Sequence, residues 1–101
     1  MNLIWSKRAT RDLEQIGAYI ALDAPDRARS FVQTFIERAK KARHLSNAGR
    51  IVPEFQDENV RELIEDNYRI VYEIRLTKKE IIILTVFEGY RLLQKFSSQK
   101  K

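Results

Sequence analysis

The sequence predicts an α+β domain in which a helical hairpin packs on a mainly antiparallel sheet of about four strands. Two observations lead to this prediction. Three β-type segments, residues 61–64, 68–76 and 81–87, follow one another along the chain with short polar turns between them. Two amphipathic helical segments precede them, separated by a break at Pro25, and a short apolar strand comes before both.

Length and composition indicate a single domain over residues 1–101. The chain has 101 residues, of which 44% are hydrophobic and 33% charged, an ordinary globular balance. It contains no cysteine and a single histidine, His44, so we expect no disulfide, no cofactor and no metal site. No apolar stretch reaches the roughly 20 residues of a membrane span, and no signal-peptide pattern is found. We therefore expect a cytoplasmic protein with no membrane partner.

The N-terminal part predicts a strand followed by a helix. Residues 2–5 form a short apolar run, and Ser6 is a typical N-cap for the helix after it. Apolar residues then recur at helical spacing, at Ala9, Leu13, Ile16 and Ile20. The positions that we expect on the solvent side of this helix are Lys7, Arg8, Arg11, Asp12, Glu14 and Gln15.

The next segment predicts a second helix that returns along the first. Pro25 suits the first turn of a helix, and the pattern continues to about His44 or Leu45. Asn47 and Gly49 are typical of a helix end. Because the connection is short, we expect an antiparallel hairpin whose joined apolar faces cover the sheet. The apolar stripe of the second helix comprises Ala28, Phe31, Val32, Phe35, Ala39 and Ala42.

Residues 46–60 show no sustained period of either helix or strand. They predict an irregular connection, and connections of this length in a compact domain are often functional. We also expect the apolar residues Ile51, Val52 and Phe55 to attach this segment to the core.

The strand pattern predicts two different sheet faces. In residues 68–76 the apolar side chains alternate with Arg69, Val71, Glu73 and Arg75. Residues 81–87 are apolar on both faces, which is typical of a central, buried strand. Beyond the last strand, residues 95–101 are polar and we expect a flexible tail.

The charge balance favours an anionic partner, either nucleic acid or an acidic protein. The net charge is +5 and the isoelectric point is about 9.7. Within residues 38–50 every charged side chain is basic, and the same holds for residues 91–101. Many small domains are equally basic for solubility alone, so charge by itself decides little.

Taken in this order, several segments resemble the RelE/ParE superfamily of toxins from type II toxin–antitoxin modules. They are Gly49-Arg50-Ile51-Val52-Pro53-Glu54, residues 61–64, residues 68–72 and residues 83–93. The N-terminal pattern Trp5-Ser6-x-x-Ala9-x-x-Asp12-Leu13 matches as well, so the similarity runs from about Leu3 to Leu93. The resemblance implies a toxin that arrests bacterial growth and is held silent by an antitoxin. It also offers two mechanisms.

The first mechanism is RelE-like cutting of messenger RNA on the ribosome, which would make the chain a metal-independent endoribonuclease. Such a reaction needs a base, cations that hold the phosphate, and an acid for the leaving oxygen. The resemblance implies Glu54 as a catalytic base, Arg69 as a phosphate ligand and Tyr90 as an aromatic that stacks on a base. The residues expected to bind phosphate or a partner are Arg50, Arg61, Glu88 and Arg91.

Some residues depart from the nuclease pattern. His44 lies at the end of the second helix, and Glu88 occupies a position where many relatives carry histidine. A carboxylate there repels phosphate unless Arg69 or Arg91 pairs with it. An alternative for Arg69 is a structural ion pair across the sheet, with Glu62 or Glu73.

The second mechanism is ParE-like inhibition of DNA gyrase, which needs an exposed protein-binding surface and no proton-transfer pair. We favour it, with the RelE-like nuclease as the alternative. In both cases the resemblance implies a cognate antitoxin, and the net charge of +5 suits an acidic one that docks along the hairpin or at a sheet edge. Operator DNA would be contacted only through that antitoxin. The hairpin cations that could meet gyrase are Lys7, Arg8, Arg11, Arg27 and Arg29.

Overall fold

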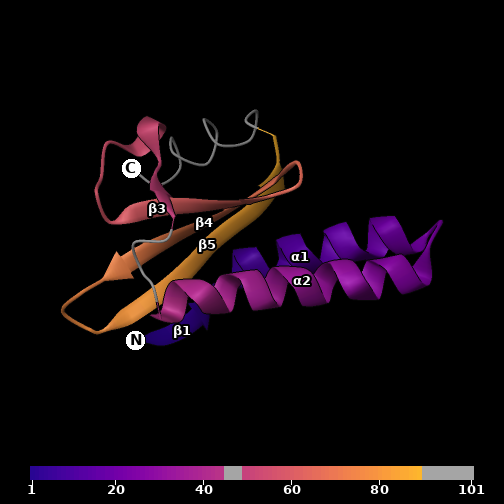
Figure 1. Ribbon diagram of the computed structural model, residues 1–101, viewed down its shortest axis with the longest axis horizontal. Helices are drawn as coiled ribbons and strands as arrows, with labels where there is room; N and C mark the ends of the chain where they lie inside the picture. The colour runs from indigo at the N-terminus through magenta and orange to yellow at the C-terminus, as the bar shows by residue number, and fades with distance from the viewer. Residues whose placement is uncertain (45–48, 90–101) are drawn as a thin grey trace.

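A five-stranded sheet carries a helical hairpin on one face. The computed structural model describes residues 1–44 and 49–89, with the backbone alone for Glu54. The elements, in chain order, are β1 (Asn2–Trp5), α1 (Lys7–Ala21), α2 (Pro25–His44), β2 (Arg50–Ile51), the 3-10 turn η1 (Pro53–Phe55), β3 (Val60–Glu65), β4 (Tyr68–Arg75) and β5 (Glu80–Glu88). The strand order is β1-β5-β4-β3-β2, with β1 parallel to β5 and the other pairs antiparallel (Figure 1). The predicted α+β class is confirmed.

The alternation in β4 correctly separates two sheet faces, and each face carries a buried cluster. Ile70, Tyr72 and Ile74 face the helices and share a core cluster with Phe35. Val71 faces the other way and packs with residues such as Val52, Val60 and Phe87 in a second cluster. Strand β5 lies between β1 and β4, and its residues Ile81, Ile83 and Val86 are buried in the helix-side cluster. The prediction of an interior strand over residues 81–87 is therefore confirmed.

A β-bulge changes the phase of β5 half-way along. The register with β4 runs Val71 to Thr85 and then Tyr72 to Ile83, so Leu84 is an extra residue on β5. The extra residue moves the helix-facing side chains from the odd positions 81 and 83 to the even position 86. A pure period-2 pattern cannot place such a shift.

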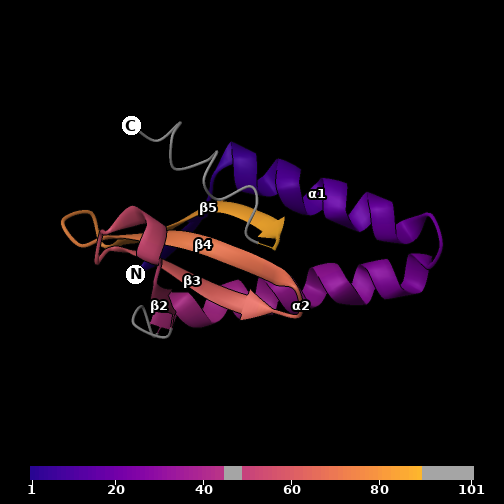
Figure 2. The same ribbon diagram turned by 90° about the horizontal axis from the view of Figure 1, so that it is seen from above.

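The two helices begin where their first residues predict and lie antiparallel (Figures 1 and 2). The Ser6 side chain accepts a hydrogen bond of 3.0 Å from the Ala9 amide, and Pro25 is the first residue of α2. A Cβ added at Gly17 would stand 3.0 Å from Cγ2 of Val32, so glycine allows this close approach of the helices. The far end of the hairpin projects beyond the sheet in both views, and there Tyr19 and Leu22 are 75% and 80% exposed.

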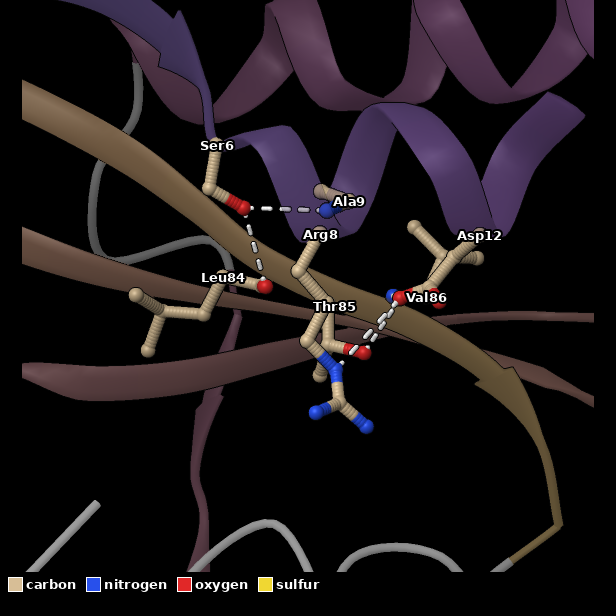
Figure 3. Close-up of polar contacts among 7 residues, drawn as sticks. All are labelled: Ser6, Arg8, Ala9, Asp12, Leu84, Thr85 and Val86. Carbon is tan, nitrogen blue, oxygen red and sulfur yellow. Dashed lines mark hydrogen bonds and ion pairs between the residues drawn. The ribbon is translucent and has the colours of Figure 1, made fainter. Parts of the chain in front are cut away.

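The start of α1 completes the outer edge of β5 (Figure 3). Strand β1 ends at Trp5, opposite Ile83, so beyond that point no strand among residues 1–44 and 49–89 pairs with the edge of β5 that faces away from β4. The Ser6 hydroxyl donates to the Leu84 carbonyl at 3.0 Å, and the Asp12 carboxylate accepts from the Val86 amide at 3.1 Å. The same carboxylate accepts from the Thr85 hydroxyl at 2.6 Å. The expectation that Asp12 faces solvent is therefore wrong, because its carboxylate satisfies this open strand edge.

The segment before β3 is more regular than the sequence predicts. Residues 50–51 add a fifth strand, and η1 follows them. The Gly49 amide donates to the Tyr72 hydroxyl at 2.9 Å, and a Cβ at Gly49 would stand 2.5 Å from that oxygen, so only glycine fits. Val52 is fully buried and Phe55 packs beside it, as expected. The same expectation is wrong for Ile51, which is 42% exposed at the sheet edge.

Candidate functional site

The residues singled out for phosphate chemistry lie on both faces of the sheet. Arg61 and Glu88 stand opposite helix-facing tyrosines, whereas Arg69 lies on the other face. Arg69, on β4, is 2% exposed and forms an ion pair with Glu62 of β3, which is 1% exposed. The Arg69 guanidinium also lies 5.6 Å from the centre of the Phe87 ring. Of the two acidic partners that the sequence offers Arg69, the ion pair is with Glu62. A buried guanidinium held in this way is a structural group in the free protein.

Glu62 also pairs with Arg50, so one carboxylate serves two arginines. The Arg50 side chain is 54% exposed, and its Nε donates to Glu62. Arg61, the next candidate, holds the neighbouring loop: its guanidinium donates to the carbonyls of Glu58 and Gly49, at 3.1 Å each. The structure thus brings Arg50, Arg61 and Arg69 together around β3, where all three make contacts within the chain.

Glu88 lies at the end of β5, beside a hollow of about 360 Å³. The hollow is lined by Ile64, Asp66, Asn67, Arg69, Glu88 and Gly89. Gly89 adopts φ +72°, and its amide donates to the Asn67 carbonyl at 2.9 Å. Glu88 is exposed and stands opposite Tyr68 in the register. Two of the predicted residues therefore line this hollow, the buried Arg69 and the exposed Glu88.

The other predicted residues are only partly described. Tyr90 and Arg91 lie outside the described residues, and Glu54 is seen as backbone within η1. The catalytic roles of Glu54, Arg69 and Tyr90 therefore stay predictions. His44 is exposed at the last residue of α2. Within residues 1–44 and 49–89, no three His, Cys, Asp or Glu side chains gather as metal ligands would. No helix in these ranges is long and apolar enough to cross a membrane.

Two tyrosines beside these groups have perturbed pKa values. Burial raises the pKa of Tyr72, and the hydrogen bond that its oxygen accepts from Gly49 opposes this effect. Burial also raises the pKa of Tyr68, and the nearby carboxylate of Glu88 raises it further. Both phenols are therefore neutral at physiological pH, and Tyr72 serves as a fixed acceptor inside the domain.

A second candidate site is an apolar groove of about 910 Å³ between α1 and α2, called here the hairpin groove. Small residues, among them Gly17 and Ala18, let the helices approach and leave room above them. The groove runs along α1 from Thr10 to Ala21, which is roughly 16 Å at 1.5 Å per residue. Its lining consists of Trp5, Thr10, Leu13, Glu14, Gly17, Ala18, Ala21, Pro25, Ala28, Arg29, Val32, Gln33 and Ile36.

The hairpin groove has the shape and polarity to receive an amphipathic helix of about three turns. Its middle is apolar, while Glu14, Arg29 and Gln33 provide polar groups in the lining. The sequence predicts docking along the hairpin in general terms but assigns the apolar residues of both helices to the sheet. A sequence signal for the groove does exist, because the apolar arc of α1 is wider than the stripe that faces the core. Ala18 and Ala21 extend this arc beside the stripe and line the groove.

Comparisons with known proteins find one family model and several solved structures that match the chain. The sequence model of a family described as the ParE toxin of the type II toxin–antitoxin system parDE matches residues 3–93. No curated protein sequence matches the chain. Among solved structures, the chromosomal ParDE system from P. aeruginosa is 26% identical, with a TM-score of 0.74 over 89% of this chain and 97% of that one.

Two further structures share the fold at lower identity. The RelBE2 toxin–antitoxin complex from Mycobacterium tuberculosis is 19% identical, with a TM-score of 0.61 over 86% of this chain and 95% of that one. The isolated RelE toxin from E. coli is 11% identical, with a TM-score of 0.66 over 99% of this chain and 98% of that one.

Proposed function

The chain belongs to the ParE toxin family of type II toxin–antitoxin systems, and from this membership we propose that it arrests bacterial growth by inhibiting DNA gyrase. A cognate antitoxin silences it in the uninduced cell. Both gyrase and the antitoxin are cytoplasmic partners, so the toxin acts in the cytoplasm. The observation that carries the choice of gyrase over messenger RNA is the burial of Arg69.

A nuclease must bring its phosphate-binding cations to the substrate. Arg69 is 2% exposed and pairs with a carboxylate that is 1% exposed, so reaching RNA requires opening a buried ion pair. A gyrase inhibitor makes no such demand, because it needs exposed surface alone. The hairpin offers exposed cations at Lys7, Arg11 and Arg27. Two others are less available: Arg8 is half-buried beside Asp12, and Arg29 pairs with Asp26.

The supercoiling reaction tests this choice. Purified protein is added to gyrase, ATP and relaxed plasmid, and the same preparation is added to translating ribosomes. We expect loss of supercoiling or accumulation of cleaved plasmid, with messenger RNA left intact. Cuts in the ribosomal A site that disappear in Glu54→Ala, with gyrase unaffected, would instead establish the RelE-like alternative. Normal growth of bacteria that express abundant soluble protein would exclude both.

The antitoxin partner is proposed to place an amphipathic helix in the hairpin groove. The groove is apolar and about the length of three helical turns, and the chain carries a net charge of +5 that an acidic partner complements. An occupant there would cover part of both helices and would obstruct a larger partner that approaches the hairpin.

A single charge in the groove tests the antitoxin site. Ala18 is exposed and lines the groove, whereas Gln15 is exposed on the same helix outside it. Ala18→Arg should weaken antitoxin binding at least tenfold in calorimetric titration, because the new cation must be desolvated beneath the partner helix. Gln15→Arg adds the same charge and should bind normally. Equal affinity of the two variants would exclude the groove as the antitoxin site.

A further inference from the structure

Three exposed cations gather at the end of the molecule away from the hairpin tip. They are Arg43 in the last turn of α2 and Lys78 and Lys79 in the β4–β5 turn, and are called here the cationic end. Figure 1 shows the β4–β5 turn, the N-terminus and the C-terminal end of α2 at the same end of the molecule. A hollow of about 570 Å³ lies among them, lined by Met1, Asn2, Arg43, Leu76 and Lys79.

Backbone contacts hold these cations in place. The Nε of Arg43 donates to the Met1 carbonyl at 3.2 Å, and this hydrogen bond orients the guanidinium group. The Lys79 amide donates to the Leu76 carbonyl at 3.1 Å, and the Lys79 carbonyl accepts from the Asn2 amide at 2.9 Å. Lys79 has φ +54°, a conformation that glycine adopts without strain.

The cationic end lacks acidic partners among the described residues. Lys40, Arg38 and Arg75 each form an ion pair, whereas none is formed by Arg43, Lys78 or Lys79 over residues 1–44 and 49–89. Among the residues that the structure describes, no carboxylate lines the hollow. Glu80 is next in sequence, but Ile81 faces the helices, so alternation directs Glu80 to the other side of the sheet. The three cations therefore present uncompensated positive charge.

We propose that the cationic end binds the phosphate backbone of duplex DNA. Arg43 and Lys79 line the hollow, and Lys78 is next to it in the same turn. An arginine fork and two ammonium groups suit phosphate oxygens, and they carry no means of reading base sequence. The choice of duplex DNA rests on the proposed gyrase function, since gyrase presents the toxin with DNA that it holds. In that setting the hairpin meets gyrase and the opposite end of the molecule meets DNA.

Salt dependence gives the expected signature. Three phosphate contacts release counterions so that the logarithm of the association constant falls against the logarithm of salt with a slope of about −2.7. Removing two of the three cations should reduce this slope by about two. Binding should be equal for duplexes of unrelated sequence, because only phosphates are contacted.

The test is fluorescence anisotropy of a labelled 20-base-pair duplex without gyrase. The double variant Lys78→Gln/Lys79→Gly removes two charges and relieves the strained backbone at residue 79. We expect it to bind at least tenfold more weakly than the parent at low salt. The control Arg11→Gln/Arg27→Gln removes two exposed hairpin charges and should stay within twofold of the parent.

Equal weakening in the two double variants, or no binding by the parent at low salt, overturns the inference. Stronger binding of duplex RNA of the same sequence through the same lysines overturns its assignment to DNA. Because the assay contains no gyrase, its failure says nothing against gyrase inhibition, which the supercoiling reaction decides separately.

Discussion

Replacing Glu62 by alanine removes the carboxylate that faces the buried guanidinium of Arg69. Both side chains are almost fully buried, at 1% and 2% exposure. Breaking a buried ion pair from one side typically costs about 3–5 kcal/mol, because the remaining charge stays desolvated. A domain of this size is stable by only about 5–15 kcal/mol, so the variant should lose about a fifth of its stability or more.

Urea unfolding followed by circular dichroism measures this loss. In a thermal melt followed in the same way, the melting temperature should fall by at least about 12 °C, because each kcal/mol lowers it by roughly 4 °C in a domain of this length. The matched control is Glu37→Ala. Its carboxylate pairs with Lys40 at 3.3 Å with both side chains more than half exposed, and should contribute about 0–1 kcal/mol.

The apolar double variant Glu62→Leu/Arg69→Met completes the cycle. Exchanging both charges for similar apolar volume should recover most of the stability that Glu62→Ala loses. If Glu62→Ala lowers the free energy of unfolding no more than Glu37→Ala does, Arg69 is not held as a buried ion. The argument against a phosphate-binding role for Arg69 would then be refuted. A folded, stable Arg69→Ala protein would contradict the structural role directly.

Three further changes follow from the fold. Asp12→Ala should cost about 1–3 kcal/mol in urea unfolding, because two donors at the open edge of β5 lose their acceptor, whereas Glu14→Ala should be nearly neutral. Burial raises the pKa of Tyr72 in the folded protein above its ordinary value of about 10 in the unfolded chain. The contribution of the Tyr72 side chain to folding stability is therefore full below pH 10 and is lost as pH rises through the folded pKa. Tyr72→Phe should therefore be less stable at neutral pH but lose less between pH 9 and 11, and an equal loss would refute this linkage. Gly17→Leu should cost about 1–3 kcal/mol by forcing the helices apart, and the addition of Val32→Ala should restore part of it, which thermal melts of the single and double variants can measure.

Most of the fold could be predicted because local signals and burial agree. The alternation over residues 68–76 correctly separates the helix-facing side chains, such as Ile70 and Tyr72, from Val71 on the other face. Ser6 caps α1 and Pro25 begins α2, as these residue types predict. The strand β2 could not be predicted, since two residues have no period. It forms where the Tyr72 hydroxyl and Gly49 fix the chain against β3, a contact between residues 23 positions apart.

The misplacement of Asp12 has a similar cause. Charge alone assigns it to solvent, but an unpaired strand edge 73 residues later provides its partners. That edge exists only because β1 ends at Trp5, which no local pattern reveals.

The sequence predicts where the residues of the candidate site lie in the sheet, but it does not predict how deeply Arg69 is buried. Alternation places Arg69 opposite to the helix-facing side chains, and the sequence offers Glu62 as its partner. Its burial depends on how the neighbouring strands and the segment around Val52 and Phe55 pack over that face. The hairpin groove likewise depends on how closely two helices approach at Gly17, which is a tertiary property.

Plasmid topology and messenger RNA, taken from one culture minutes after induction, test the proposed activity most directly. Inhibition of gyrase should leave the plasmid relaxed or linear while transcripts remain full length. Normally supercoiled plasmid together with transcripts cut at codon spacing would contradict the proposal and identify the ribosome as the target.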